Sequence, residues 1–284
     1  MSTVLITGAT GGIGLETARV LAQMGHSVLI HGRDAGKGEA AVEMIRAGAA
    51  AGANVRFLRA DFASLAQVRQ LAADINASVP RLDVLINNAG CASFSRTVTA
   101  DGYERTFAVN HLAPFLLTCL LLNKLGQSGP ARIVNVASRA HRDQEMDFSD
   151  LMSNRNYRLM RTYGRSKLAN ILFTRTLAKR LAGTNVTANS LHPGLVATGI
   201  GQTNVLARLV WKLTVRVRGG ISVQEGARTS LYLATSPEVE GQSGGYYVRC
   251  RPAQLQTRPE AVADAAGQRL WKMSEELVGL SCSR

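Results

Sequence analysis

The stretch VLITGATGGIG, residues 4–14, decides the fold of this chain. Its apolar run ends at Thr7, and glycines follow at positions 8, 12 and 14, before a segment with apolar residues at helical spacing. Glycines between a strand and a helix let the backbone approach a pyrophosphate closely, and the N–H groups that begin the helix can bind its charge. A tight turn without a ligand is the alternative. The glycines follow the first strand of a chain in which strands and helices alternate, and that position favours a dinucleotide site over a turn without a ligand.

Beyond this stretch, short apolar runs alternate with segments of helical periodicity. Strict alternation implies parallel strands joined by crossover helices, and nearly continuous apolar strands imply a sheet covered on both faces. We therefore predict one α/β domain over residues 1–284, a Rossmann-type doubly wound parallel sheet of about seven strands with helices on both faces. The stretch Arg251–Arg258 is predicted to be a loop. The expected strands are Val4–Thr7, Ser27–His31, Asn54–Arg59, Asp83–Asn87, Arg132–Ala137, Asn185–Leu191 and Gly245–Val248.

The charge balance indicates what the protein could bind. The chain has 33 basic and 20 acidic residues, a formal net charge of +13, and the excess lies almost wholly in residues 151–284. A basic field favours an anionic partner, such as a phosphorylated cofactor, an acidic substrate or a membrane surface. An arginine-rich surface without a dedicated partner is the simpler interpretation. No zinc-finger spacing or aromatic-basic RNA motif is present, so we expect no nucleic-acid partner.

Neither a membrane span nor a signal peptide is expected. The best apolar stretch, Leu112–Leu125, is too short to cross a bilayer and is interrupted by Pro114 and Asn123. No basic leader precedes the first apolar run, so we expect a cytoplasmic protein; peripheral membrane contact and homo-oligomer formation stay open. The four cysteines lack metal-ligand spacing, so we expect free thiols and no metal site. They are Cys91, Cys119, Cys250 and Cys282.

The glycine spacing T-G-x-x-x-G-x-G resembles that of the short-chain dehydrogenase/reductase family, and further landmarks of that family follow in its order. The match covers essentially the whole chain and implies hydride transfer between a nicotinamide cofactor and a small-molecule carbonyl or alcohol. The landmarks are Asp61 after the third strand, Asn87-Asn88-Ala89-Gly90 at the fourth, Asn110 in a helix, Ser138 after the fifth, Tyr163-x-x-x-Lys167, and Pro193-Gly194 after the sixth.

The resemblance implies a catalytic set of Asn110, Ser138, Tyr163 and Lys167. Tyr163 and Lys167 are four residues apart on a predicted helix, so their side chains share one face. A nearby ammonium, or the positive nicotinamide of an oxidised cofactor, favours the phenolate form of tyrosine. Tyr163 can then exchange a proton with the substrate oxygen, which Ser138 would hydrogen-bond. In the family, an asparagine such as Asn110 holds a water that extends a proton relay from the lysine.

The cofactor contacts that the resemblance implies lie at the strand ends. Arg33 follows the second strand, where an NAD enzyme places an acid against the ribose and an NADP enzyme places a cation against the 2′-phosphate. We therefore expect a preference for NADP(H), while NAD(H) would gain if Asp34 faced the ribose. The expected contacts are Gly8, Thr10, Gly12, Ile13, Gly14, Arg33, Asp61, Phe62, Asn87, Ala89, Gly90, Tyr163, Lys167, Pro193, Gly194, Val196 and Thr198.

Three segments resemble the retinol-dehydrogenase-like branch of the family: Arg139-Ala140-His141, residues 163–170, and Leu270-Trp271-Lys272. Many members of that branch carry an N-terminal membrane anchor; we expect none here, which argues against a microsomal retinoid role. A lipophilic substrate is expected, and His141 is expected at the surface.

A substrate lid is predicted around residues 195–220. Within it, Asn204–Val217 has one apolar stripe at helical spacing and is flanked by Gly201 and Gly219-Gly220, which could act as hinges. A fixed helix packed on the core is the alternative.

Two other functions fit parts of the sequence. A non-catalytic dinucleotide-binding sensor or scaffold could share the fold, but the intact Ser138, Tyr163 and Lys167 favour an enzyme. A sugar-nucleotide epimerase fits less well, because the glycine spacing differs and the chain after Pro193 is short for a dedicated substrate domain.

Overall fold

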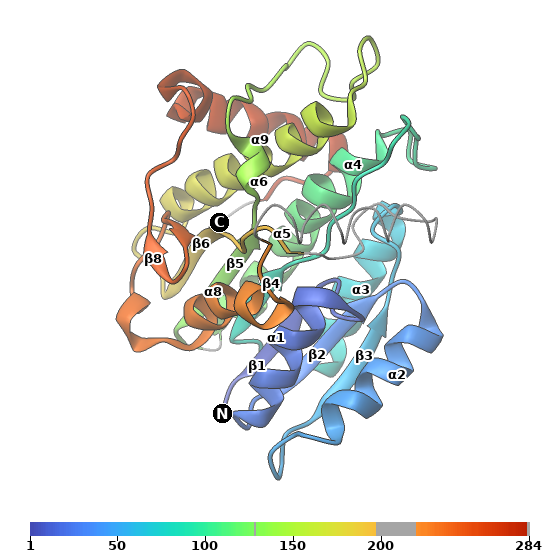
Figure 1. Ribbon diagram of the computed structural model, residues 1–284, viewed down its shortest axis with the longest axis vertical. Helices are drawn as coiled ribbons and strands as arrows, with labels where there is room; N and C mark the ends of the chain where they lie inside the picture. The colour runs from blue at the N-terminus through green and yellow to red at the C-terminus, as the bar shows by residue number, and fades with distance from the viewer. Residues whose placement is uncertain (128, 197–219, 283–284) are drawn as a thin grey trace.

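The computed structural model describes residues 1–127, 129–196 and 220–282 and shows one sheet between two layers of helices (Figure 1). In these residues the sheet has eight strands in the order β3-β2-β1-β4-β5-β6-β7-β8. Neighbouring strands from β3 to β7 are parallel, whereas β8 pairs with β7 antiparallel. The strands are β1 (Thr3–Ile6), β2 (Ser27–Gly32), β3 (Val55–Arg59), β4 (Val84–Asn87), β5 (Ala131–Val136), β6 (Val186–His192), β7 (Tyr246–Val248) and β8 (Arg251–Pro252).

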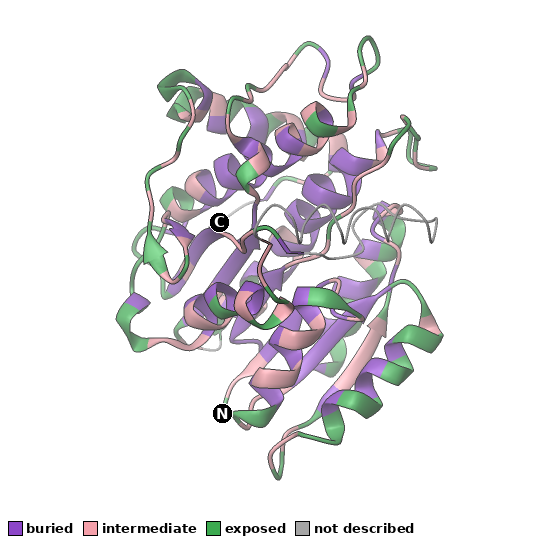
Figure 2. Cartoon of the chain, viewed as in Figure 1, coloured by how far each residue is buried: buried purple, intermediate pink, exposed green. Residues whose placement is uncertain are grey.

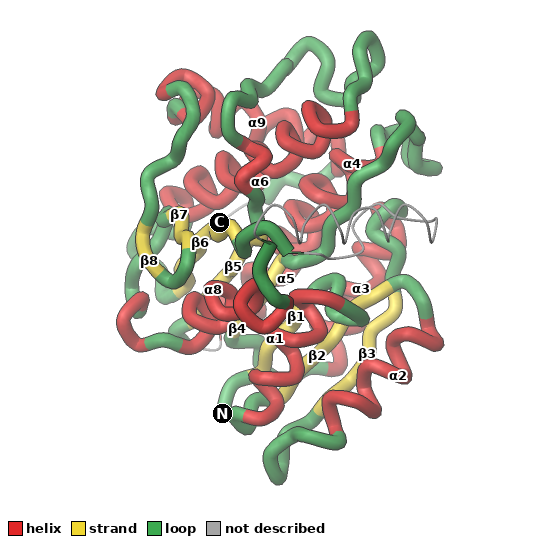
Figure 3. Tube along the Cα trace, in the orientation of Figure 1, coloured by secondary structure: helices red, strands yellow, loops and turns green. Residues whose placement is uncertain are grey.

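Helices connect the strands and cover both faces of the sheet (Figure 3). Several begin at a residue whose side chain accepts a hydrogen bond from the first turn, as Asp34, Ser64 and Ser222 do. The helices are α1 (Gly12–Gln23), α2 (Ala35–Arg46), α3 (Leu65–Ser78), α4 (Arg105–Phe107), a π-helix (Ala108–Leu112), α5 (Ala113–Gln127), α6 (Leu159–Arg180), α8 (Val223–Thr235) and α9 (Asp264–Val278), with 3₁₀-helices at Arg139–His141, Pro237–Val239 and Pro259–Val262.

Two apolar cores lie on opposite faces of the sheet, because successive side chains of a strand point to opposite sides. On β1, Leu5 packs in the core beneath α3, α5 and α6, while Val4 and Ile6 pack in the core beneath α1, α2 and α8. Figure 2 shows the central strands buried, the edge strand β3 partly buried and β8 exposed, with other exposed residues on the outer sides of the helices. Burial on both faces explains why the strands read as continuous apolar runs.

The seven expected strands are confirmed, each with ends within one residue of the prediction. The stretch after Cys250 departs from its prediction, since Arg251–Pro252 forms the short edge strand β8 before the loop. Proline is tolerated on an edge strand, where its missing N–H leaves no neighbour unpaired.

The sheet changes its direction of growth between β1 and β4. From β1 the chain first adds β2 and β3 on one side and then β4 to β7 on the other. In open parallel sheets, ligands bind in the crevice outside the carboxyl ends of the strands at such a point. The fold therefore places a binding crevice where the glycine turn after β1 meets the segment after β4.

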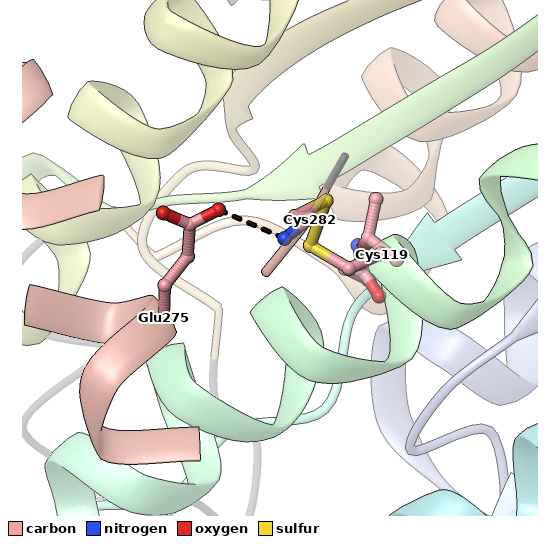
Figure 4. Close-up of a disulfide and its surroundings, with 5 residues drawn as sticks. Cys119, Glu275 and Cys282 are labelled. Carbon is pink, nitrogen blue, oxygen red and sulfur yellow. Dashed lines mark hydrogen bonds between the residues drawn. A yellow bond between two sulfur atoms is a disulfide. The ribbon is translucent and has the colours of Figure 1, made fainter. Parts of the chain in front are cut away.

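The expectation of free thiols is wrong for two cysteines. Cys119 of α5 and Cys282, which follows α9, form a disulfide with their Cα atoms 5.2 Å apart (Figure 4). The N–H of Cys282 donates to Oε1 of Glu275 at 2.8 Å. The two cysteines are 163 residues apart in the sequence, so no local spacing could indicate the pair. The packing of Trp271 of α9 against Phe115 of α5 brings their segments together.

Within the described part of the chain, one helical stretch, Arg105–Gln127, is long and apolar enough to cross a membrane by length and composition alone. Its most apolar window has a mean hydropathy of 1.4 and is 83% buried inside the fold. α5 packs against α3 and the sheet, so this stretch has the burial of a core helix.

The predicted lid at Asn204–Val217 lies outside the described residues.

Candidate active site

The glycine turn between β1 and α1 packs tightly against the end of β4. Gly8 and Gly12 have φ values of +65° and +57°, in the left-handed region that favours glycine. A Cβ at Gly8 would lie 2.7 Å from Cα of Ala89, and a Cβ at Gly14 would lie 2.5 Å from the carbonyl oxygen of Gly8. Gly11 precedes α1 without a side-chain cap, which suits a helix start that binds an anion.

Asn88 ties the glycine turn to the end of β4, a role that the sequence prediction missed. Its Nδ2 donates to the carbonyl oxygens of Thr7 at 2.8 Å and Gly8 at 3.0 Å. In return, Oγ1 of Thr7 accepts from the backbone N–H groups of Asn88 and Ala89, each at 3.0 Å. The position of Asn88 within the N-N-A-G segment was the signal that could have identified it.

Asn87, the preceding residue and a predicted cofactor contact, turns its side chain into the core. It is 3% exposed, and its Nδ2 donates to Oγ1 of Thr118 at 3.0 Å and Oδ1 of Asn135 at 2.8 Å. The side chain of Asn87 therefore links β4, β5 and α5 beneath the cleft.

His31 on β2 supports the glycine turn from below, and nothing in the sequence pattern indicated this. Its Nδ1 accepts from the N–H of Gly8 at 3.3 Å, and its Nε2 lies 3.0 Å from the carbonyl oxygen of Ala60. The ring stacks on Phe62 with 4.2 Å between centroids. Burial lowers the pKa of His31 to about 4, so at neutral pH the ring is uncharged, Nδ1 accepts and Nε2 donates. Phe62, a predicted cofactor contact, is therefore 3% exposed and has its ring packed against His31.

The far end of the crevice is an open cleft of about 620 Å³ where β2 and β3 end. Two predicted residues, Arg33 and Asp61, line it, together with Asp34 and Arg59. Asp34 caps α2: its Oδ1 accepts from the N–H of Lys37 at 3.0 Å, and Oδ2 lies 3.8 Å from Nζ of Lys37. The carboxylate of Asp34 is therefore held toward its own helix, and Arg33 is the first charged group after β2 that is available to a ligand.

Ser138 and Tyr163 meet at the carboxyl end of β5. Ser138 precedes the 3₁₀-helix Arg139–His141, and its Oγ accepts from the N–H of Ala140 at 3.2 Å. Tyr163 lies near the start of α6, and its side chain interacts with that of Ser138. Burial raises the pKa of Tyr163 above its usual value, and the interaction with Ser138 opposes that rise.

Lys167 lies one helical turn after Tyr163 and is 3% exposed. Its Nζ donates to the carbonyl oxygen of Val136 at 3.0 Å and lies 5.8 Å from the centroid of the Tyr163 ring. Burial lowers the pKa of Lys167 to about 8, so the ammonium persists at neutral pH. A Cβ at Gly90 would lie 3.3 Å from that Nζ and 3.4 Å from Oδ1 of Asn110, so this glycine keeps space beside both groups.

Asn110 occupies the π-helix Ala108–Leu112 and is fully buried. Its Oδ1 accepts from the N–H of Cys91 at 2.7 Å, and its Nδ2 donates to the carbonyl oxygen of Cys91 and Oγ of Ser166, each at 2.9 Å. Single π-turns inside α-helices occur frequently at functional sites. The structure therefore gathers the four predicted catalytic residues, with the side chain of Asn110 fixed by the protein itself.

Pro193 and Gly194 follow β6 beside this group. Gly194 has a φ of +99°, and a Cβ there would lie 2.3 Å from Cδ1 of Ile221. Val196 is 7% exposed and packs in a small apolar cluster with Ile13 of α1. The predicted contact Thr198 lies outside the described part of the chain.

The prediction that His141 lies at the surface is wrong. The residue is 1% exposed, because the 3₁₀-helix after Ser138 turns it inward. Its Nδ1 lies 2.6 Å from the carbonyl oxygen of Ser138, and its ring packs edge-on against Tyr246 with 5.3 Å between centroids. His141 therefore supports the backbone at Ser138 from within the fold.

Comparison with known sequences identifies the family to which this chain belongs. The sequence model of short chain dehydrogenases matches residues 2–208. The chain belongs to the short-chain dehydrogenase family. This short-chain dehydrogenase is 45% identical to retinol dehydrogenase 14 of Mus musculus and 42% identical to retinol dehydrogenase 12 of Homo sapiens. Each alignment covers 98% of this chain and 86% of the relative. It is therefore a retinol-dehydrogenase-like member, an oxidoreductase that acts on CH–OH groups or carbonyls.

Solved structures agree with this placement. An uncharacterized protein of Mycobacterium paratuberculosis matches this short-chain dehydrogenase with a TM-score of 0.79 and 32% identity, over 100% of this chain and 96% of the other. A protein of Beutenbergia cavernae, solved with bound NADP, matches with a TM-score of 0.70 and 26% identity, over 87% and 94% of the two chains.

Proposed function

We propose that this short-chain dehydrogenase uses NADP(H) to interconvert a lipophilic aldehyde or ketone and its alcohol, with Tyr163 as the proton donor and acceptor. The observation that carries the proposal is the convergence of Ser138, Tyr163 and Lys167 at the crevice that begins with the glycine turn. Those are the groups that bind a carbonyl oxygen, move its proton and supply a nearby positive charge.

The residues fit a dinucleotide along the whole crevice. At the turn, Gly8 and Gly14 let the backbone pack closely against Ala89 and Asn88, and Gly11, beside the start of α1, has open space in front of it where a pyrophosphate could approach. Asn88 and His31 hold the same turn in place by hydrogen bonds to Thr7 and Gly8. When bound, a nicotinamide cofactor supplies or accepts the hydride.

Tyr163 is the group that exchanges the proton. In carbonyl reduction its hydroxyl donates to the substrate oxygen as that oxygen gains negative charge, while the hydroxyl of Ser138 hydrogen-bonds the same oxygen. In alcohol oxidation the tyrosine receives the proton. Since burial raises the pKa of Tyr163, nearby positive charge must make the phenolate accessible. Lys167 supplies such a charge 5.8 Å from the ring, and an oxidised nicotinamide adds another.

A lipophilic substrate fits the apolar residues near this group. Met160 precedes Tyr163 by three residues on α6, on the same side of the helix, and is 59% exposed. Leu195 follows Gly194 and is 40% exposed. Relatives that are 40–45% identical are named for retinol, a largely apolar alcohol.

A substrate panel tests the activity. We expect NADPH consumption with a series of straight-chain aldehydes, and a kcat/KM that rises with chain length, because each buried methylene adds about 0.8 kcal/mol of transfer free energy. The measurement is NADPH absorbance under initial-rate conditions, with glyceraldehyde as a polar control. Binding of NADPH without turnover of any aldehyde, ketone or alcohol would support the non-catalytic sensor instead.

The preference for NADP(H) is assigned to Arg33. We expect Arg33→Ala to weaken NADPH binding by roughly ten- to a hundredfold, since charge-assisted hydrogen bonds contribute about 1.5–3 kcal/mol. NADH binding should change little, because NADH lacks the 2′-phosphate. Equilibrium dissociation constants for both cofactors, from nucleotide fluorescence, are the measurement. Equal affinities of the wild type for NADPH and NADH would contradict the assignment.

A further inference from the structure

A second arginine stands at the same end of the crevice as Arg33. Arg59 is the last residue of β3 and pairs in register with Gly32, the residue before Arg33. Both arginines are exposed, and both line the 620 Å³ cleft. Because β2 and β3 are parallel and adjacent, their carboxyl ends place the two guanidinium groups at one edge of the sheet.

A hydrogen bond holds Arg59 beside Arg33. Nε of Arg59 donates to the carbonyl oxygen of Arg33 at 3.3 Å. Across residues 1–127, 129–196 and 220–282, this is the sole hydrogen bond of that guanidinium, and neither arginine forms an ion pair. The terminal N–H groups of Arg59 are therefore available to a ligand in the cleft.

The two carboxylates of the cleft are used elsewhere. Asp34 caps α2 and lies 3.8 Å from Nζ of Lys37. Oδ1 of Asp61 accepts from the N–H of Ala63 at 3.0 Å, and the N–H of Asp61 donates to Gln67. Neither carboxylate forms an ion pair with Arg33 or Arg59, so both guanidinium groups can bind an anion that offers several acceptor oxygens.

We propose that Arg59 is a specificity-determining residue that binds the 2′-phosphate of NADP(H) jointly with Arg33. A phosphate monoester offers enough oxygen atoms for both guanidinium groups. The free ribose hydroxyl of NAD(H) carries no charge and would leave both guanidinium groups without an anionic partner. The inference rests on the proposed preference for NADP(H) and extends it to a residue on a different strand.

Equilibrium binding of the purified full chain tests the inference without relying on turnover. Arg59→Gln should raise the dissociation constant of NADPH about tenfold and leave that of NADH within about twofold. The same variant should weaken displacement by 2′,5′-ADP but not by 5′-AMP, which locates the loss at the 2′-phosphate. Arg56→Gln is the matched control: Arg56 lies on the same strand and donates to Oγ of Ser78 at 3.3 Å, and it does not line the cleft.

A double variant separates shared from independent contacts. If Arg33 and Arg59 bind one phosphate, Arg33→Ala combined with Arg59→Gln should depart from the product of the two single effects on NADPH affinity. The inference about Arg59 would be overturned if the wild type prefers NADPH but Arg59→Gln and Arg56→Gln have the same dissociation constant for NADPH. That result would leave the proposed preference for NADP(H) intact. A wild type without any NADPH preference would overturn both.

Discussion

Tyr163→Phe should reduce turnover by about a thousandfold, since a positioned proton donor contributes roughly 10²–10⁴ in rate. The substitution removes only the hydroxyl that interacts with Ser138 and keeps the ring beside Lys167. NADPH affinity should stay within about twofold, because the glycine turn and the arginine end of the crevice are unchanged. Steady-state kinetics with the best aldehyde, together with NADPH titration, measures both.

A control separates loss of a proton donor from general damage. Tyr247 of β7 is 2% exposed, and its hydroxyl donates to Oε1 of Gln242 at 2.7 Å, away from the crevice. Tyr247→Phe should lower the free energy of unfolding by about 1 kcal/mol and leave kcat unchanged. Tyr163→Phe with most of the wild-type kcat would refute the role given to Tyr163.

Lys167→Met should abolish turnover and yet raise the free energy of unfolding at pH 7. Burial lowers the pKa of Lys167 from 10.5 to about 8, which corresponds to a penalty of about 3 kcal/mol for burying the charge. Methionine fills a similar volume without that penalty. The lost hydrogen bond to Val136 offsets about 1 kcal/mol, so the net gain should be about 2 kcal/mol. Urea denaturation at pH 7 measures it.

The difference in the free energy of unfolding between Lys167→Met and the wild type should depend on pH, which gives a second check. The folded-state pKa of Lys167 lies below the unfolded value, so the penalty is complete below about pH 8 and disappears as the pH rises toward 10.5. The stability advantage of Lys167→Met should therefore shrink between pH 7 and pH 9.5. Lys179, exposed on the same helix and paired with Asp264, is the control. Lys179→Met should change neither turnover nor the pH dependence of the free energy of unfolding. An equal increase in stability in Lys179→Met would argue against a penalty that is specific to the buried charge of Lys167.

The sequence predicted the sheet because its strands are buried on both faces. The central strands β1, β2, β4 and β5 carry continuous apolar runs, and the glycine turn from Gly8 to Gly14 marks the passage from the first strand to the first helix. The grouping of the candidate catalytic residues was predictable for a related reason. Ser138, Tyr163 and Lys167 occupy positions that the order of strands and helices fixes, so motif order was enough to bring them together.

Supporting contacts were not predictable, because they join residues that are distant in the sequence. His31 and Gly8 are 23 residues apart, and Cys119 and Cys282 are 163 apart. Such pairs depend on which side of a strand a residue faces and how closely a helix packs, and neither follows from local composition. His141 shows the same limit: a polar residue in a loop suggested exposure, but a single turn of 3₁₀-helix buries it.

The bond between Cys119 and Cys282 turns the second half of the chain into a covalent ring. Ser138, Tyr163 and Lys167 all lie inside that ring, while the glycine turn and both arginines of the cofactor cleft lie in the open portion before it. One backbone cut anywhere within the ring would leave the two pieces joined through the disulfide, whereas one cut before residue 119 would leave two pieces with no covalent link. Oxidation state therefore decides whether proteolytic damage to the catalytic half can separate its pieces.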